Sequence, residues 1–277
     1  MLNEQQLNDI KRIQDICEKE ESIQLKLNWE MLKARKENEK MDFFHYENDT
    51  LIGFLAIYRF GNEYEICGMV HPSYRLCGVF IDLFNDAITA IPDNAKRILI
   101  NAPAKSQSAK NWLQTKTCEY TFSEYQMKWE YKKLESKDNF VQLREATSED
   151  MEIKIKLDVA CFCFDEAGAR EFNENNGKND QKVSYIIEAN HEPVGKVGVS
   201  HDEKESYIYG FAVFPKFQGQ GYGRRALTQI VRDEQKTGKD ILLEVAVENK
   251  HALKLYEDCG FHAYEVQDYY SLTRLSD

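Results

Sequence analysis

The sequence predicts an α+β fold made of two copies of one domain, and three observations support this prediction. The chain has 277 residues, enough for two domains of about 130–140 residues each. Its hydrophobic residues (42%) and charged residues (30%) occur in the proportions of a globular protein that can bury a core. Helical and strand-like hydrophobic patterns alternate along the chain, and the same order of patterns occurs twice.

The first copy begins with helices. The apolar residues of the opening segment are Leu7, Ile10, Ile13 and Cys17. They recur at steps of three and four, which places them on one face of a helix. A strand pair with a turn at Asn48 and Asp49 comes next. The expected order is then strands 43–47, 51–60 and 65–70, helix 78–89, strand 97–101, helix 106–114 and strand 125–131.

A polar stretch without periodicity, residues 132–139, separates the two copies and is expected to be a linker. We therefore expect one domain over residues 1–135 and a second over 141–277. The second domain repeats the order of the first: strand 141–145, helix 149–161, hairpin 184–189 and 194–200, strand 207–213, helix 223–236, strand 241–247, helix 251–258 and strand 269–273.

A single offset of 143 residues relates the two copies. It aligns Val70 with Val213 at the end of a strand, and Gly78 with Gly221 in the loop that follows. The same offset aligns two alanines in a later helix. Agreement at a strand, a loop and a helix indicates an internal duplication.

Charge and cysteine content exclude several classes of function. The formal net charge of −11 argues against a nucleic-acid partner, because binding to phosphates needs a cationic surface. The acidic surface either serves solubility or attracts a cationic acceptor such as an amine. The seven cysteines form no Cys-x-x-Cys pair, so we expect no metal site and the free thiols of a reducing cytosol. The N-terminal segment has no apolar core of a signal peptide and no apolar run is long enough for a membrane span, so we expect a cytoplasmic protein without a membrane partner.

A glycine-rich loop in the second copy carries the first chemical signal. A strand runs into Gln218-Gly219-Gln220-Gly221-Tyr222-Gly223 and then directly into a helix. Glycines let the backbone approach a ligand closely, and the N–H groups and dipole at the start of a helix favour negative charge. Together these features predict a cradle for a pyrophosphate. The Walker pattern is absent, and the dinucleotide fingerprint lacks its third glycine because Arg224 stands there.

A second motif follows the next strand. It reads Asn249-x-x-Ala252-x-x-x-Tyr256-x-x-x-Gly260-Phe261. Ala252 and Tyr256 share one face of the expected helix, Asn249 can cap its start and Gly260 can end it. A tyrosine in such a place is often simple packing, but here it occurs together with the glycine loop.

The two motifs together resemble the acetyl-CoA site of the GNAT N-acetyltransferase superfamily, from about residue 141 to the end of the chain. The resemblance implies, in each domain, a mixed and mostly antiparallel central sheet flanked by helices. It also implies direct transfer of an acetyl group from acetyl-CoA to an amine, without a metal. The residues that it marks as cofactor-binding are Phe211, Ala212, Val213, Gln218, Gly219, Gln220, Gly221, Tyr222, Gly223, Arg224 and Asn249.

The resemblance also suggests catalytic roles. The backbone of residues 211–213 would bind the pantetheine arm and the thioester, and Tyr256 would protonate the departing thiolate. Many relatives carry a glutamate on the strand before the loop, but residues 207–210 contain none. Glu244 is the best carboxylate by position for a general base. A solvated, non-catalytic Glu244 and a water held by Tyr209 are the alternatives.

The first copy departs from the pattern at the decisive positions. Phe80 stands where the second copy has its last loop glycine, Ser106 replaces the asparagine and Leu113 replaces the tyrosine. We therefore expect this copy to be inactive and to serve as a structural partner or a wall of the acceptor site. The segments 162–179 and 267–270, which mix aromatic and acidic residues, are expected on the acceptor side. The alternative to an enzyme is a non-catalytic acyl-CoA sensor or scaffold, and either would be a monomer or a homodimer.

Overall fold

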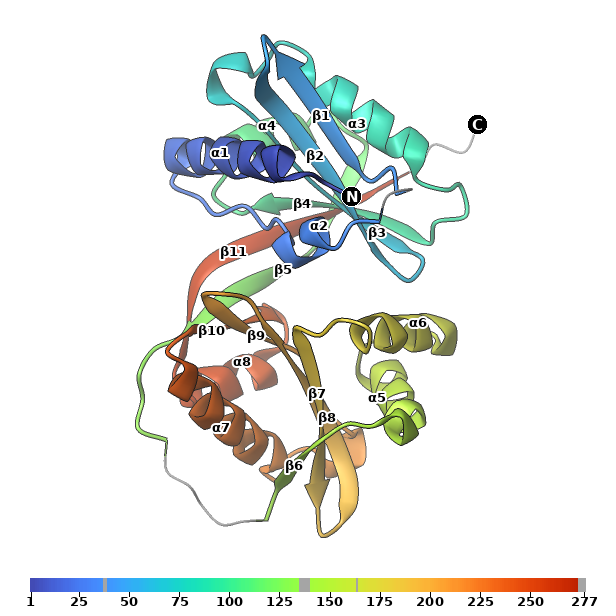
Figure 1. Cartoon of the computed structure of the whole chain (residues 1–277), viewed down its shortest axis with the longest axis vertical. Helices are drawn as coiled ribbons and strands as arrows, with labels where there is room; N and C mark the ends of the chain where they lie inside the picture. The colour runs from blue at the N-terminus through green and yellow to red at the C-terminus, as the bar shows by residue number, and fades with distance from the viewer. Residues whose placement is uncertain (37–38, 135–139, 163, 274–277) are drawn as a thin grey trace. The chain divides into compact units, whose positions relative to one another are not determined.

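The computed structural model describes residues 1–36, 39–134, 140–162 and 164–273 (Figure 1). It divides into two compact units. The first is Met1–Ser123 with Glu265–Asp277, and the second is Glu124–Tyr264. The expected domains, 1–135 and 141–277, mark the copies along the sequence and stay a prediction, and part of the expected linker lies outside the described residues.

The first unit has helices on both faces of its sheet. Its strand order is β1-β2-β3-β4-β11, antiparallel except for the parallel pair β3 and β4. Alternate residues of β2 enter two different hydrophobic clusters, one under α1 and one under α3, so nearly the whole strand is buried. The elements are α1 (Glu4–Glu21), α2 (Trp29–Lys33), β1 (Asp42–Glu47), β2 (Thr50–Phe60), β3 (Glu63–Val70), α3 (Val79–Ala90), β4 (Arg97–Pro103), α4 (Gln107–Leu113) and β11 (Phe261–Leu272). Strand β5 (Cys118–Trp129) begins in this unit and pairs in the second.

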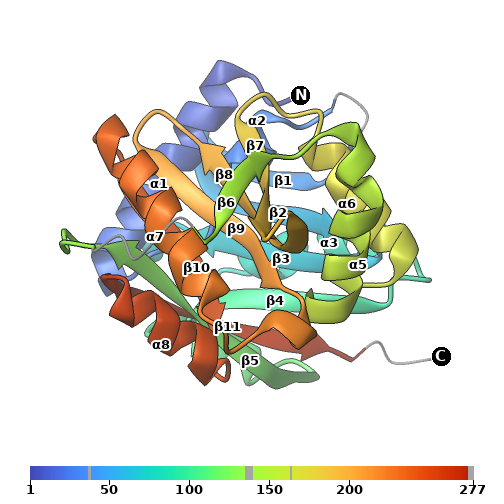
Figure 2. The same ribbon diagram turned by 90° about the horizontal axis from the view of Figure 1, so that it is seen from below.

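The second unit has the strand order β6-β7-β8-β9-β10-β5, in which only β9 and β10 are parallel. Helices α7 and α8 lie on one side of these strands and α5 and α6 on the other (Figures 1 and 2). The mixed, mostly antiparallel sheet confirms the predicted fold class. The elements are β6 (Gln142–Glu145), α5 (Met151–Phe162), α6 (Glu166–Asn176), β7 (Lys182–Ala189), β8 (Glu192–His201), β9 (Glu205–Val213), α7 (Tyr222–Glu234), β10 (Asp240–Ala246) and α8 (Lys250–Asp258).

The repeat of 143 residues holds at the ends of the elements. Strand β4 covers Arg97–Pro103 and β10 covers Asp240–Ala246, while β5 begins at Cys118 and β11 at Phe261. The last strand of each copy, however, pairs in the other copy's unit. Strand β5 pairs with β10, and β11 pairs with β4. This strand exchange explains why the compact units do not follow the order of the chain.

Helix α5 buries two charged side chains beside its apolar ones. Leu157 is fully buried, and Lys154 and Asp158 are buried beside it. Asp158 lies 2.6 Å from the Nζ atom of Lys196 on β8, and the side chain of Asn173 on α6 donates to it at 2.6 Å. The ion pair makes burial of the charge tolerable. Helix α6, within the segment 162–179, was not predicted as a helix.

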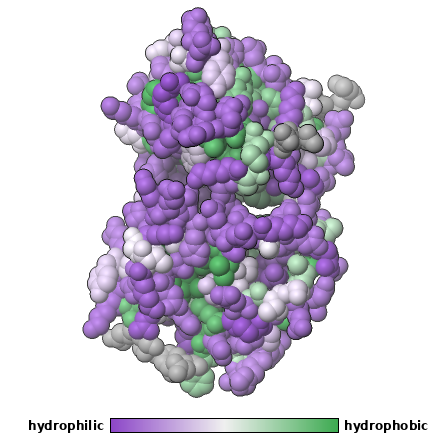
Figure 3. Space-filling model, viewed as in Figure 1, coloured by the Kyte–Doolittle hydropathy of each residue, from purple (hydrophilic) through white to green (hydrophobic). Residues whose placement is uncertain are grey.

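Both units expose a polar surface. The face drawn in Figure 3 is mainly hydrophilic, as the 30% of charged residues leads one to expect. Among the described residues, no helix is long and apolar enough to cross a bilayer.

Candidate active site

The glycine loop adopts a conformation that favours glycine at two positions. After β9 ends at Val213, a short 3-10 turn leads to Gln218, whose Nε2 atom donates to the carbonyl of Val213 at 2.9 Å. Gly219 has a φ of +75° and Gly221 a φ of +81°. A Cβ atom on Gly221 would also lie 2.6 Å from Nη1 of Arg225. The loop is thus a compact turn whose backbone is exposed to solvent.

Helix α7 begins at this loop without a side chain to cap it. Gly221 is the N-cap residue, and it offers no side-chain hydrogen bond to the first turn. The first backbone N–H groups of α7 therefore have no intrahelical partner, and helix starts of this kind favour bound anions. Tyr222, Gly223 and Arg224 supply these groups.

Two arginines follow the loop, and the structure separates their roles. The side chain of Arg224 pairs with Asp258 at 2.5 Å and, by this hydrogen bond, lowers the pKa of that carboxyl, so only its backbone N–H would face a bound anion. Arg225 donates from Nη1 to the carbonyl of Gln220 at 3.3 Å. Its Nε atom is buried without a hydrogen-bond partner in the described part of the chain. Sequence reasoning missed Arg225, although a cation in the first turn after a glycine loop is a usable signal.

Strands β9 and β10 part beside the loop. Their parallel pairing runs from Glu205 with Asp240 to Ile208 with Leu243 and ends there, while both strands continue. Strand β9 also carries a bulge, because its register with β8 shifts around Gly210, which has a φ of +55°. Ala212 and Val213 pair with β8 on one side, and on the other side residues 211–213 lie beyond the pairing of β9 with β10. An extended arm of a ligand can hydrogen-bond to such an edge.

Tyr256 lies under this opening, on α8. It is 7% exposed and packs between Phe211 and Phe261, with ring centroids 6.4 and 6.1 Å away. Burial raises the pKa of Tyr256 well above its ordinary value, so the phenol keeps its proton at neutral pH. Asn249 caps α8 through Oδ1, which accepts from the backbone N of Ala252 at 3.1 Å. The side-chain amide nitrogen of Asn249 is not used for this cap.

The two candidates for the general base lie on the other face of the sheet. Glu244 follows the last residue of β10 that pairs with β9, and its Oε1 atom accepts from Gln126 of the exchanged strand β5 at 3.3 Å. Its neighbours Leu243 and Val245 point into the core with Tyr256, so Glu244 points the opposite way. The ring of Tyr209 covers Gly198, where a Cβ atom would be 2.4 Å from it.

The first copy keeps the backbone of the loop but fills the space around it. Leu76 and Gly78, the counterparts of the two left-handed glycines, have φ values of +63° and +86°. Strand β3 pairs with β2 in regular register, without the bulge. The rings of Phe80 and Trp112 meet edge to face, with their centroids 4.7 Å apart. A Cβ atom on Gly68 would lie 2.9 Å from the Phe80 ring. The second copy has the reverse arrangement, a phenylalanine on the strand and a glycine on the helix.

A carboxylate occupies the start of α4 in the first copy. Glu21 accepts hydrogen bonds from Ser106 at 2.9 Å and from Ser108 at 2.5 Å, and it forms an ion pair with Arg75. Burial alone would raise the pKa of Glu21, but these hydrogen bonds and Arg75 outweigh burial and lower it. The carboxylate of Glu21 thus binds Ser106 and Arg75, the residues that correspond to Asn249 and Gln218. That the first copy is inactive stays a prediction, which this filling supports.

Metal ligands were not expected. In the ranges that the structure describes, no three His, Cys, Asp or Glu side chains come together in a way that could hold a metal ion.

Comparison with known proteins agrees with this geometry. A family model described as "Acetyltransferase (GNAT) family" matches residues 140–261. An uncharacterised N-acetyltransferase of Methanocaldococcus jannaschii is 34% identical over 97 residues, which are 32% of this chain and 43% of the relative. The [ribosomal protein bS18]-alanine N-acetyltransferase of Escherichia coli is 37% identical over 71 residues, 25% of this chain and 48% of the relative. The chain thus spans less than half the length of these relatives.

Solved structures resemble the whole chain in fold. A GCN5-related N-acetyltransferase from Sphaerobacter thermophilus aligns with a TM-score of 0.76 at 14% identity, covering 95% of this chain and 91% of that one. A tandem GNAT protein from the clavulanic acid biosynthesis pathway aligns with a TM-score of 0.71 at 12% identity, covering 99% and 97%. At these identities the likeness establishes the fold alone. Residues 140–261, which contain the glycine loop and Tyr256, are the part of the chain that matches the GNAT acetyltransferase family.

Proposed function

We propose that this protein is an N-acetyltransferase that moves an acetyl group from acetyl-CoA directly to an amine. The observation that carries the proposal is the opening between β9 and β10. An uncapped helix start lies at one end of it, and the protonated Tyr256 lies on one face. A carboxylate, Glu244, lies on the other face.

The residues at this opening fit acetyl-CoA. The two left-handed glycines leave space above the loop that a Cβ atom would restrict, and the start of α7 with Arg225 supplies positive charge for a pyrophosphate. The edge of residues 211–213 and the amide of Asn249 would hold the pantetheine arm. When bound, acetyl-CoA supplies an acetyl group activated as a thioester.

Tyr256 and Glu244 divide the proton transfers between the two faces of the sheet. Tyr256 holds a proton at neutral pH and would deliver it to the sulfur that leaves. Glu244 would take a proton from the amine, directly or through water, with Gln126 orienting its carboxylate. Acid and base on opposite faces do not neutralise one another before the substrates bind.

The acceptor is proposed only as a primary amine. Relatives that are 37% identical over 71 residues are named for the alanine of ribosomal protein bS18. A peptide with an amino-terminal alanine is therefore the first acceptor to test, followed by diamines and amino sugars.

The test is release of CoA thiol from acetyl-CoA in the presence of this panel, with CoA binding measured by calorimetry on the same preparation. Turnover with at least one amine, and its loss in Tyr256→Phe with CoA affinity retained, is the expected result. Tight CoA binding without turnover on any acceptor would instead support an acyl-CoA sensor.

A further inference from the structure

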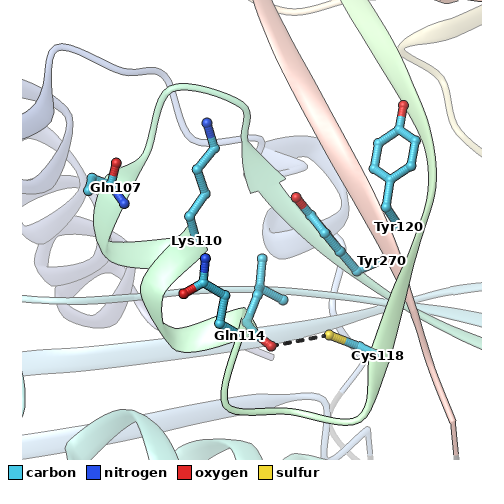
Figure 4. Close-up of a pocket in the computed structure, with 7 residues that line it drawn as sticks. Gln107, Lys110, Gln114, Cys118, Tyr120 and Tyr270 are labelled. Carbon is cyan, nitrogen blue, oxygen red and sulfur yellow. Dashed lines mark hydrogen bonds between the residues drawn. The ribbon is translucent and has the colours of Figure 1, made fainter.

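A cavity of about 380 Å³ lies in the first unit, between α4 and the strands β5 and β11 (Figure 4). This volume is in the range of small-molecule sites. Figure 4 shows Lys110 extending from α4, with Tyr120 and Tyr270 on the strands across from the helix. The residues that matter for recognition are Lys110, Leu113, Gln114, Cys118, Tyr120 and Tyr270, and we call this cavity the α4 pocket.

The duplication shows which side chains at the pocket are smaller in the first copy. At the offset of 143 residues, Leu113 corresponds to Tyr256 and Cys118 to Phe261. In the second unit these two aromatic residues are 7% and 0% exposed and belong to the hydrophobic core. The first copy has smaller residues at both positions, which leaves space beside α4.

The aromatic wall of the pocket is held in place. The hydroxyl of Tyr120 donates to Ser123 at 2.9 Å, because the Ser123 hydroxyl itself donates to Asp268 at 2.5 Å. The rings of Tyr120 and Tyr270 meet edge to face, with centroids 5.9 Å apart and planes at 77°. A wall fixed in this way loses little freedom when a flat ligand binds.

The polar groups of the pocket point to an anion. Lys110 stands where the second copy has Leu253, a residue packed against its core. The pocket therefore combines apolar and aromatic walls with one cation and the side-chain amides of Gln107 and Gln114. An aromatic ring would pack against these walls, and a carboxylate would pair with the ammonium group of Lys110.

We propose that the α4 pocket binds a small aromatic carboxylate, with the ring against Leu113, Tyr120 and Tyr270 and the carboxylate at Lys110. This site belongs to the first unit and does not depend on acetyl transfer. It gives the copy that lacks the catalytic tyrosine a binding role of its own.

The probe is 2-naphthoate, titrated into the full chain with CoA present in excess and followed by calorimetry and ligand-observed NMR. Saturable binding to one site is expected, and 2-naphthylmethylamine, which has the same ring and the opposite charge, should not compete. Lys110→Glu should weaken binding by about fivefold or more, since it replaces an attraction by a repulsion at an exposed position. Lys116→Glu is the matched control, because the Lys116 ammonium lies over Phe84 and Trp112 outside the pocket.

Filling the pocket is the second test. Cys118→Phe restores the residue of the second copy and should abolish naphthoate binding without lowering the melting temperature. Equal affinity in wild type and Lys110→Glu, or no saturable binding to wild type, would overturn the proposal. Lys110→Glu alters only an exposed side chain, so it decides the matter even if Cys118→Phe does not fold.

Discussion

Replacing Tyr256 by phenylalanine distinguishes a packing role of this tyrosine from a catalytic role. The ring packs against Phe211 and Phe261, and phenylalanine keeps those contacts. The substitution therefore removes one hydroxyl group and leaves no cavity of side-chain size, so the free energy of unfolding should change by less than about 1 kcal/mol.

The effect on catalysis should be much larger. A general acid contributes about 10²–10⁴-fold to a rate, equivalent to roughly 3–5 kcal/mol of barrier. We expect kcat for acetyl transfer to fall by that factor in Tyr256→Phe, while the affinity for acetyl-CoA changes less than about threefold. Because burial raises its pKa, Tyr256 should add no titration to the rate profile below about pH 10.

The assay is steady-state thiol release with the best acceptor of the panel, alongside calorimetry with CoA. Tyr185→Phe is the matched control, since Tyr185 is a partly buried tyrosine on β7 whose pKa burial also raises. It should leave kcat unchanged. A Tyr256→Phe enzyme with wild-type kcat would remove the tyrosine from the mechanism and leave it as a core residue.

Three further predictions follow from the site and the second unit. Gly221→Ala should weaken CoA binding about tenfold, because its Cβ displaces Arg225. Gly78→Ala is the control: it has the same positive φ but open space around it, so it should only cost about 1 kcal/mol of stability. Equal CoA affinities in the two variants would count against the pyrophosphate cradle. Glu244→Gln should lower kcat about 10²-fold or more, and a variant with wild-type kcat would rule out Glu244 as the general base. Hydrogen bonds from Arg144 lower the pKa of Asp150 to about 2, so this group stabilises the fold above about pH 4 and the contribution disappears as pH falls toward 2. Urea denaturation of Asp150→Asn should show a loss of about 1 kcal/mol at pH 7, because the Arg144 side chain is 36% exposed and solvent screens the pair, and little difference from wild type at pH 2.

The sequence determined the local chemistry of the site. Left-handed φ values at Gly219 and Gly221, the helix that starts directly after them and the asparagine cap of α8 are properties of a few consecutive residues. These features depend on short-range interactions, so the motif and its spacing predicted them. The sequence predicted the fold class as well. The role of Arg225 was missed because only its contact with the loop distinguishes it from Arg224.

Tertiary structure decided what depends on partners distant in the chain. Strands β5 and β11 have patterns that fit either copy, and a strand does not specify its neighbour by its own alternation, so their exchange was not visible. Burial of Asp158 required Lys196 from another element. The α4 pocket, likewise, exists because small residues of one copy face a strand that the other copy contributes. The sequence alone could name these residues, but only packing could show that they meet.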